Sequence, residues 1–413
     1  MFKIILFVIS ICPTLAHSEN HHDHLEYLPT QNSFKSVLSE IGSIKVSNFS
    51  MARNIDAWSL QLNISQNKMT KSLSDSETTI ADLAESLGLS LENFVKKASS
   101  MNNQVADANK TEISGVPTQI RKSYQTATSF RNDLLLNISS EGFTTIIKET
   151  FKITSIMDTK ELKLSVSPRF FRSDQIAKVY TLKRQSFAHG HSIKIYQSIS
   201  RRTMVIDSNN DPKLPIRYAD LIDGIDLTGS LFDRSNLYSV IKFQKGLERL
   251  FQISSHNDTG LRVHAYESTR TGKFYRALNN LLQSYESKLK LSIGHISALS
   301  KVDIDLFASL PRNIELDVNA NIATNIVTGS SKIKKIEENL LYLEKKHIPI
   351  TWGSDGLNLV PGSHFIEQMS LLIKNGEHKR HWLRELYKKT GFKNTCKILS
   401  SGNELPKFLG KYF

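Results

Sequence analysis

Short apolar runs alternate with amphipathic stretches over much of the chain, and this alternation constrains the fold more than any other feature. From about residue 158 onward, runs of β-branched and aliphatic residues are separated by segments with helical spacing. Strands that alternate with helices predict a parallel sheet wrapped by helices. The candidate strands are 162–166, 193–199, 221–227, 261–265, 289–293, 314–318 and 348–352, and helical segments between them include 237–251, 275–285 and 333–343.

Two topologies accommodate this pattern. A (β/α)8 barrel closes with eight strands, and the segment that remains for the eighth is the short one around 21–28. A doubly wound open sheet is the alternative, but no glycine-rich phosphate loop follows any candidate strand. We therefore predict an α/β fold of the (β/α)8 TIM barrel type over residues 17–413.

The segment from about residue 30 to 158 has a different texture. It is polar, has few strand signals and shows helical spacing at positions such as Ile80, Leu83 and Leu87. We predict that it forms a mostly helical insertion after the first barrel strand.

The first sixteen residues have the three parts of a signal peptide. Lys3 supplies the positive start, residues 4–11 the apolar run, and 13–16 a small-residue cleavage site. That run is too short to span a bilayer, and no later segment is long enough. We expect export, to the periplasm or the extracellular space, with an uncleaved anchor or a buried first strand as alternatives. Cys12 lies in the signal and leaves Cys396 alone in the mature chain, which excludes an internal disulfide.

The formal net charge is +13, from 53 basic and 40 acidic residues, which raises the question of a polyanionic partner. The basic residues are scattered, and the densest groups, at 332–335 and 374–384, are short. A solvated basic surface explains them better than a nucleic-acid groove. We therefore predict no nucleic-acid partner.

Histidine and acidic residues lie where candidate strands end. His22 and His24 are two apart, a spacing that directs both imidazoles to one side of a strand. His264 lies near the end of one later strand, His295 follows another and Asp355 follows the last. Each position alone is better explained as an ordinary strand-end, turn or cap residue. Barrel enzymes keep their active sites at the carboxyl ends of strands, so the set together predicts a site.

Six ordered motifs resemble those of the adenosine and AMP deaminases, within the metal-dependent amidohydrolase barrels. The motifs are His-Asp-His-Leu at 22–25, Gly-Ile-Asp-Leu-Thr-Gly at 224–229, His-Ala-Tyr-Glu at 264–267, Ile-Gly-His at 293–295, Glu-Leu-Asp-Val-Asn-Ala-Asn at 315–321 and Ser-Asp-Gly at 354–356. The resemblance covers about residues 160–365 and the N-terminal motif, and with the signal sequence it implies a secreted member of the family.

The resemblance implies one Zn²⁺ per chain. Its ligands would be His22, His24, His264 and Asp355, which are donor types that zinc uses. A zinc site of this kind makes a water molecule reactive near neutral pH.

The resemblance also implies catalytic and substrate-binding roles. Glu267 would protonate the ring nitrogen next to the carbon that bears the amine. His295 would orient the attacking water, and Asp355 would hydrogen-bond the same water. Gly229 would offer a backbone N–H to the purine ring, and Glu26 would reach a sugar hydroxyl.

Four positions depart from the family pattern. Gly356 replaces a second aspartate that contacts the purine, and Tyr27 and Tyr266 stand where the family has glycine. Ala320 replaces a serine. Because the zinc and catalytic residues are spared, these departures indicate altered substrate choice rather than loss of catalysis.

The expected function is therefore hydrolytic deamination of adenosine or a related aminopurine nucleoside, with release of ammonia. One alternative is an amidohydrolase acting on another aminated heterocycle. A second is a non-catalytic, zinc-stabilised secreted binding or signalling protein in which residues 30–158 do the work. The resemblance also allows a homodimer, and no transmembrane span is expected.

Overall fold

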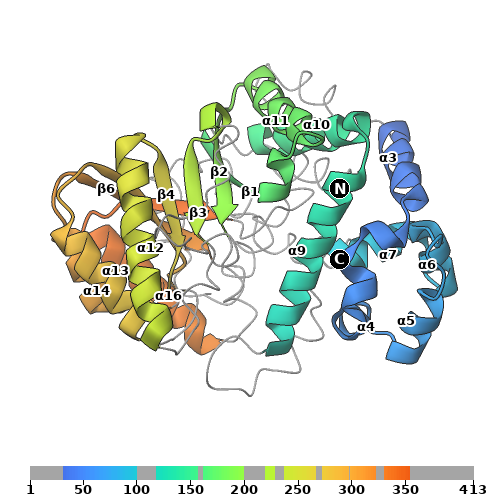
Figure 1. Cartoon of the computed structure of the whole chain (residues 1–413), viewed down its shortest axis with the longest axis horizontal. Helices are drawn as coiled ribbons and strands as arrows, with labels where there is room; N and C mark the ends of the chain where they lie inside the picture. Colours follow the sequence, from blue (N-terminus) through green and yellow to red (C-terminus); the bar gives the residue numbers. More distant parts are fainter. Residues whose placement is uncertain are drawn as a thin grey trace, which may run out of the picture.

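A curled parallel sheet with helices on its outer side forms the centre of the protein, and a helical segment lies beside it (Figure 1). The computed structural model describes residues 31–99, 118–156, 161–199, 219–227, 237–266, 272–296, 298–321 and 330–353. The predicted signal peptide and the predicted strand at 21–28 lie outside these ranges.

The described sheet has seven strands, all parallel and hydrogen-bonded in the order of the sequence. Because a doubly wound sheet reverses its strand order at a switch point, this topology excludes the open-sheet alternative. The strands are β1 Glu161–Val166, β2 Ser192–Ile199, β3 Gly224–Leu227, β4 Gly260–His264, β5 Leu289–Gly294, β6 Ile314–Asn321 and β7 Ile350–Gly353. The sheet curls enough for Lys163 Nζ on β1 to lie 3.0 Å from Asp317 Oδ2 on β6. This half-barrel is compatible with a (β/α) barrel.

Two strands begin later than the sequence pattern predicts. Leu221 ends a 3₁₀ turn, η4 Ala219–Leu221, and the N–H of Ile195 is bonded at 2.8 Å to the Asp223 carboxylate instead of extending the ladder. β7 starts at Ile350 rather than at Ile348, whose N–H donates to Leu343 O at the end of the preceding helix. The intervening proline has no N–H to give to a ladder.

Alternation along the strands separates an apolar outer face from a polar inner one. Ile195, Leu227 and Val263 are fully or almost fully buried, and they have the parity that faces the helices. Residues of the other parity meet on the concave side, where the Ser165 hydroxyl bonds the carboxylate of Asp226. The period of two residues in a strand therefore produces a polar interior in this half-barrel.

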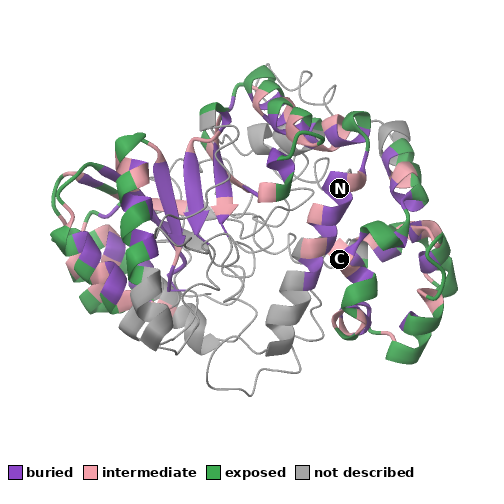
Figure 2. Cartoon of the chain, viewed as in Figure 1, coloured by how far each residue is buried: buried purple, intermediate pink, exposed green. Residues whose placement is uncertain are grey.

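Among the described residues, five helices follow strands and cover the outer face. They are α11 Ile176–Ala188, α12 Leu237–His256, α13 Gly272–Ser284, α14 Lys301–Ala308 and α16 Ser330–Lys345. Helix α14 begins at Ser300, whose hydroxyl accepts from the Asp303 N–H while the Asp303 carboxylate accepts from the Ser300 N–H. Figure 2 shows buried residues concentrated on the sheet and on the sides of the helices that face it.

The segment before β1 is helical, as predicted, over its described residues. Its α-helices are α3 Gln31–Ser43, α4 Ile55–Leu62, α5 Gln66–Ser72, α6 Ile80–Ser86, α7 Leu91–Ser99, α9 Thr118–Asn137 and α10 Ser140–Ile156. Phe130 of α9 is fully buried and contacts the rings of Phe49, Trp58 and Phe94. This aromatic cluster gives the segment a core.

The helical segment and the sheet share that core. Val166 of β1, Val179 of α11 and Ile195 of β2 belong to the same cluster of buried side chains as Phe130. The buried Lys178 of α11 donates from Nζ to three carbonyls near the end of α9, those of Leu135, Leu136 and Ile138, at 2.8–2.9 Å. Lys178 of α11 thus caps the carbonyl groups near the end of α9.

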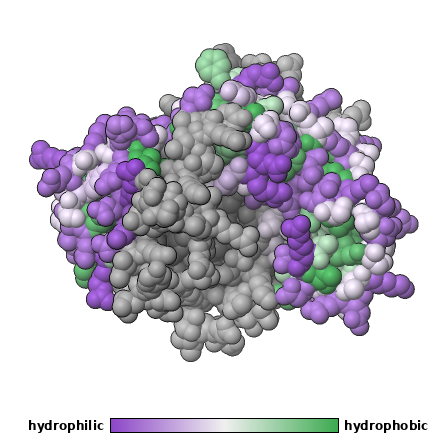
Figure 3. Space-filling view, viewed as in Figure 1, coloured by the Kyte–Doolittle hydropathy of each residue, from purple (hydrophilic) through white to green (hydrophobic). Residues whose placement is uncertain are grey.

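Two further properties concern the surface. None of the helices that the structure describes combines the length and apolar character needed to cross a membrane. Figure 3 shows hydrophilic residues over most of the described surface in this view, with small hydrophobic patches among them.

The burial of Lys178 leads to a prediction about pH. Desolvation lowers the pKa of Lys178 to about 8, against 10.5 for the free side chain. Between these values the unfolded chain binds a proton that the folded chain releases, so the contribution of Lys178 to the free energy of unfolding rises with pH. Urea unfolding of wild type and Lys178→Met from pH 7 to 10 should show the stability of wild type rising relative to the variant. A relative decline would mean that the fold favours the charged amine.

A tyrosine ring lies where two neighbouring strands carry glycine. A Cβ at Gly260 would collide with the hydroxyl of Tyr196, and a Cβ at Gly224 would collide with the ring carbons of Tyr196 and lie 2.5 Å from Gly260 O. The same ring lies under the Arg262 guanidinium, whose Cζ is 4.7 Å from the ring centroid. Glycine at both positions therefore makes room for this ring.

We predict that Gly260→Ala lowers the free energy of unfolding by about 1–3 kcal/mol through overpacking. Chemical denaturation in a Tyr196→Phe background should show a smaller loss, because the colliding hydroxyl is gone. Gly224→Ala is the matched control, since its clash involves ring carbons that phenylalanine retains. An equal cost for Gly260→Ala in both backgrounds would show that the ring hydroxyl does not set the constraint.

Candidate active site at the carboxyl ends of the strands

Two histidines from different motifs meet where β4 and β5 end. His264 is the last residue of β4, and His295 directly follows β5. His264 Nδ1 lies 3.1 Å from His295 Nε2, with the ring centroids 5.1 Å apart and the rings inclined at 63°. These two residues therefore lie together at the carboxyl edge of the sheet.

The backbone at His295 sets the direction of its ring. Its φ of 69° is in the left-handed region, which residues other than glycine rarely adopt. The N–H of His295 donates to the Asn319 carbonyl at 3.0 Å, which ties the residue to β6. The imidazole is 1% exposed, and its Nδ1 makes no hydrogen bond with the described residues. A strained backbone at a strand end is a common feature of functional sites.

A buried carboxylate completes this group. Asp226 on β3 is 2% exposed, and its Oδ1 lies 3.0 Å from His264 Nε2. Despite that distance, Oδ1 accepts no aligned hydrogen bond from the described residues. Burial alone would raise the pKa of Asp226, but His264, Arg262 and the Ser165 hydroxyl outweigh it and hold the pKa at about 2. The carboxylate is therefore ionised at neutral pH.

A second polar network lies beside the first on the concave face. Asp317 accepts from the Ser292 hydroxyl at 2.6 Å and the Thr351 hydroxyl at 3.0 Å, and it pairs with Lys163 at 3.0 Å. Every oxygen of this carboxylate is occupied. Arg262 interacts with both networks, since it donates to the Lys163 carbonyl at 3.3 Å and its charge acts on Asp226.

Sequence reasoning assigned no role to three residues around the site: Ser165, Asp226 and Arg262. Asp226 lies inside a quoted motif, but motif order alone does not show what its side chain touches. The available signal was the alternation within the strands, which gives Ser165, Asp226 and Arg262 the parity of the concave face.

Tyr266 occupies the position where the deaminase pattern has glycine, and the structure shows its backbone conformation and the packing of its ring. Its φ of 45° is left-handed, the conformation that glycine adopts at least cost. The ring is fully buried and stacks on Tyr275, with centroids 4.5 Å apart. Its hydroxyl lies 3.2 Å from Asn279 Oδ1 and 3.4 Å from Asp303 Oδ1. The side chain therefore packs against α13 and α14 on the outer side of the sheet.

Most of the predicted site residues lie outside the described ranges. These are His22, His24, Glu26, Gly229, Glu267 and Asp355. Of the predicted set, the structure brings together His264 and His295. No group of three or more histidine, cysteine, aspartate or glutamate side chains in the described residues could hold a metal ion.

The described residues nevertheless fit a zinc site in their chemistry. Imidazole nitrogens and carboxylate oxygens are the donors that zinc takes in such sites. Asp226 Oδ1 and His295 Nδ1 are buried polar atoms that make no hydrogen bond with the described residues, and such atoms are expected to face an ion, a water or a ligand.

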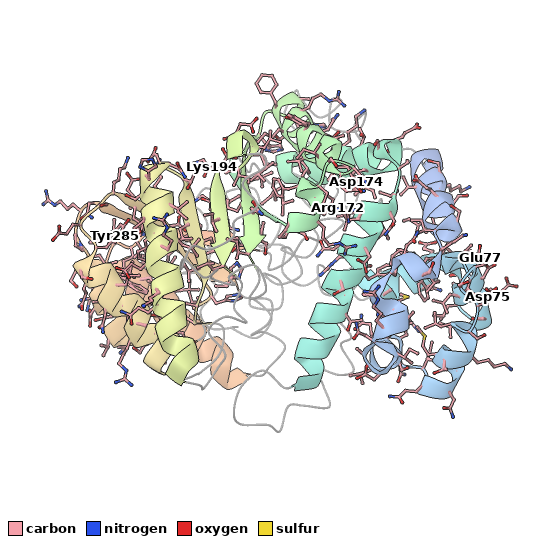
Figure 4. All side chains as sticks on the ribbon, viewed as in Figure 1. Asp75, Glu77, Arg172, Asp174, Lys194 and Tyr285 are labelled. Atoms are coloured by element: carbon pink, nitrogen blue, oxygen red, sulfur yellow. The ribbon has the colours of Figure 1, made fainter. Side chains whose placement is uncertain are left out.

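A cavity of about 520 Å³ lies elsewhere, at the amino ends of β4 and β5, and is lined by Asn257 and Tyr285 among others. Tyr285 is labelled in Figure 4. This cavity therefore lies at the opposite ends of the strands from His264 and His295.

No protein-family model matches the chain, and no curated protein matches it significantly. The motifs and the geometry of the site are therefore the basis for a functional proposal.

Because Tyr266 packs on the outer side of the sheet, we predict that a change in its side chain affects stability and leaves the site at the strand ends unchanged. Burial and the Asp303 carboxylate raise the pKa of Tyr266 well above its usual value, so its hydroxyl remains a donor. Tyr266→Phe should lower the free energy of unfolding by about 1 kcal/mol through the lost hydrogen bond. The contact between His264 and His295 should not change in a crystal structure of the variant, because the hydroxyl packs against α13 and α14. Displacement of the two imidazole rings would contradict this placement.

Proposed function

We propose that this protein is a zinc-dependent aminohydrolase that converts adenosine, or a related aminopurine nucleoside, to the hydroxylated purine and ammonia. The observation that carries the proposal is the contact between His264 and His295. These residues come from separate motifs 31 positions apart, and their rings lie 3.1 Å from each other beside an ionised carboxylate. In the deaminase-like pattern, the same two residues are a zinc ligand and a catalytic histidine.

The proposal includes parts of the chain outside the described residues. The segment 21–28 would close the half-barrel as its eighth strand and bring His22 and His24 to the site. Asp355 follows β7 by two residues in the sequence, and the proposal requires it at the same edge of the sheet. The apolar start of the chain, residues 1–16, supports an exported protein.

Zinc would be held by His22, His24, His264 and Asp355. When bound, it would supply a Lewis acid that makes a water molecule nucleophilic near neutral pH.

The chain's own groups would handle the protons. His295, fixed by its backbone bond to β6 and excluded from solvent, would orient the attacking water and accept a proton from it. Glu267 directly follows Tyr266, whose packing between α13 and α14 would anchor the loop that carries this carboxyl group. Glu267 would protonate the purine ring nitrogen, which makes the neighbouring carbon electrophilic. The water oxygen would then bond to that carbon, the proton held by His295 would pass to the amine, and the carbon–nitrogen bond would break to release ammonia. Glu267 would regain its proton from the new hydroxyl group.

A second candidate function is deamination of a different aminated heterocycle. Gly356 removes the carboxylate that contacts the purine in the family pattern, and Tyr27 adds bulk to the first motif. Both changes concern the substrate and leave the zinc and proton-transfer residues intact. They favour altered specificity over lost catalysis.

An ammonia assay separates the candidates. Purified, zinc-loaded protein is incubated with adenosine, deoxyadenosine, AMP and other aminopurines and aminopyrimidines, and ammonia is measured. Release from adenosine supports the first proposal, and release from another base alone supports the second. A folded protein that binds zinc and releases no ammonia from any compound would refute both and favour a binding role.

Removal of the proton donor should abolish turnover. We predict that Glu267→Gln lowers kcat at least about 100-fold while zinc content stays the same, because a general acid contributes about 10²–10⁴-fold. Glu161→Gln is the matched control, since this exposed carboxylate lies at the opposite end of β1 and pairs with Lys194 at 3.3 Å. Near-normal turnover in Glu267→Gln would show that another group supplies the proton.

A further inference from the structure

We propose that Asp226 is an additional ligand of the metal ion, besides the four residues that the motif resemblance implies. The inference rests on the zinc site of the proposed function and extends it to a residue on β3. Three observations on the described residues lead to it.

The first is an unsatisfied, buried oxygen. Asp226 is 2% exposed, and its Oδ1 makes no hydrogen bond with the described residues. Its nearest polar neighbour is His264 Nε2 at 3.0 Å, and a buried carboxylate oxygen that has no aligned hydrogen-bond donor keeps part of the cost of losing water. Coordination of a cation would remove that cost, and carboxylate oxygen is an established zinc donor.

The second observation is the direction of the nearest contact. Asp226 Oδ1 lies 3.0 Å from His264 Nε2, yet the pair is not aligned as donor and acceptor. Two ligand atoms that each lie about 2.0–2.2 Å from one zinc ion are themselves about 3.0–3.5 Å apart. The two atoms therefore have the spacing of neighbouring ligands on the same ion.

The third observation is how the carboxylate is held. Its other oxygen, Oδ2, is bonded by the Ser165 hydroxyl on β1. Arg262 is paired with Asp226 in the ladder between β3 and β4. Oδ2 is thus held by a residue of β1, while Oδ1 faces His264. Outer contacts of this kind orient ligands at metal sites.

Asp317 provides the contrast within the same half-barrel. It is also a carboxylate on the concave face, with a nearby cation and hydroxyl partners, but both of its oxygens are occupied. It therefore has no donor atom to offer a metal ion.

The test compares Asp226→Asn with Asp317→Asn in the full-length protein. Zinc dissociation constants are measured by competition with a chelator, and thermal unfolding of the metal-free proteins reports the structural cost of each change. We expect Asp226→Asn to weaken zinc binding more than about 100-fold and Asp317→Asn to change it less than about 3-fold. Asp226→Glu, which keeps the carboxylate, should recover part of the loss.

A crystal structure of zinc-loaded wild type gives a second measurement that needs no variant to fold. Asp226 Oδ1 within about 2.3 Å of the ion supports the proposal. An oxygen more than about 3 Å from the ion overturns it. A loss of only about 10- to 100-fold in Asp226→Asn with that longer distance would also overturn it and make Asp226 a positioning residue.

The ammonia assay on the same samples separates this proposal from the proposed function. Wild type that binds zinc through Asp226 but deaminates nothing would refute the aminohydrolase and leave the ligand in place. Wild type that deaminates, with normal zinc binding in Asp226→Asn, would refute the ligand and leave the enzyme. A folded wild type that binds no zinc would overturn both.

Discussion

The amphipathic character of the strands is the constraint on which the rest of the structure depends. Each strand must bury one face against helices, so alternate residues are released to the concave side. Polar residues on the concave side are stable only if they form hydrogen bonds or ion pairs with one another. Asp317 does so completely through Lys163, Ser292 and Thr351. Asp226 does so on one oxygen only, and the exception lies where the two histidines meet.

Because the parallel strands are hydrogen-bonded in sequence order, motifs that follow one another along the chain also lie next to one another in the sheet. All carboxyl ends lie along one edge, so residues from successive motifs become neighbours without any long-range signal in the sequence. The contact between His264 and His295 is the direct product of this rule, because β4 and β5 are adjacent in the sheet. The left-handed backbone at His295 adds the local adjustment that turns the ring toward its partner.

The sequence was sufficient to predict all seven described strands and the helical character of the segment before them. It was less informative where a tertiary contact competes with propensity. Leu221 has the composition of a strand residue, but the Asp223 carboxylate takes the N–H that a longer β3 would have used. The placement of Tyr266 was also hidden, since its departure from the glycine of the family pattern was interpreted as altered substrate choice, whereas its ring packs outward on Tyr275. The role of Asp226 could be inferred only from interatomic distances, because the sequence motif does not indicate which carboxylate oxygen forms a hydrogen bond.

The lysine that links α11 to the end of α9 means that the helical segment is not a detachable accessory. Its core continues into β1 and β2, and β1 carries the serine that bonds Asp226. Cutting the chain between residues 156 and 161 would leave apolar surface on both fragments and uncap three carbonyls at once. Insertions and deletions in this region would therefore disturb the core that includes β1 and β2, and the two segments should melt as one cooperative unit.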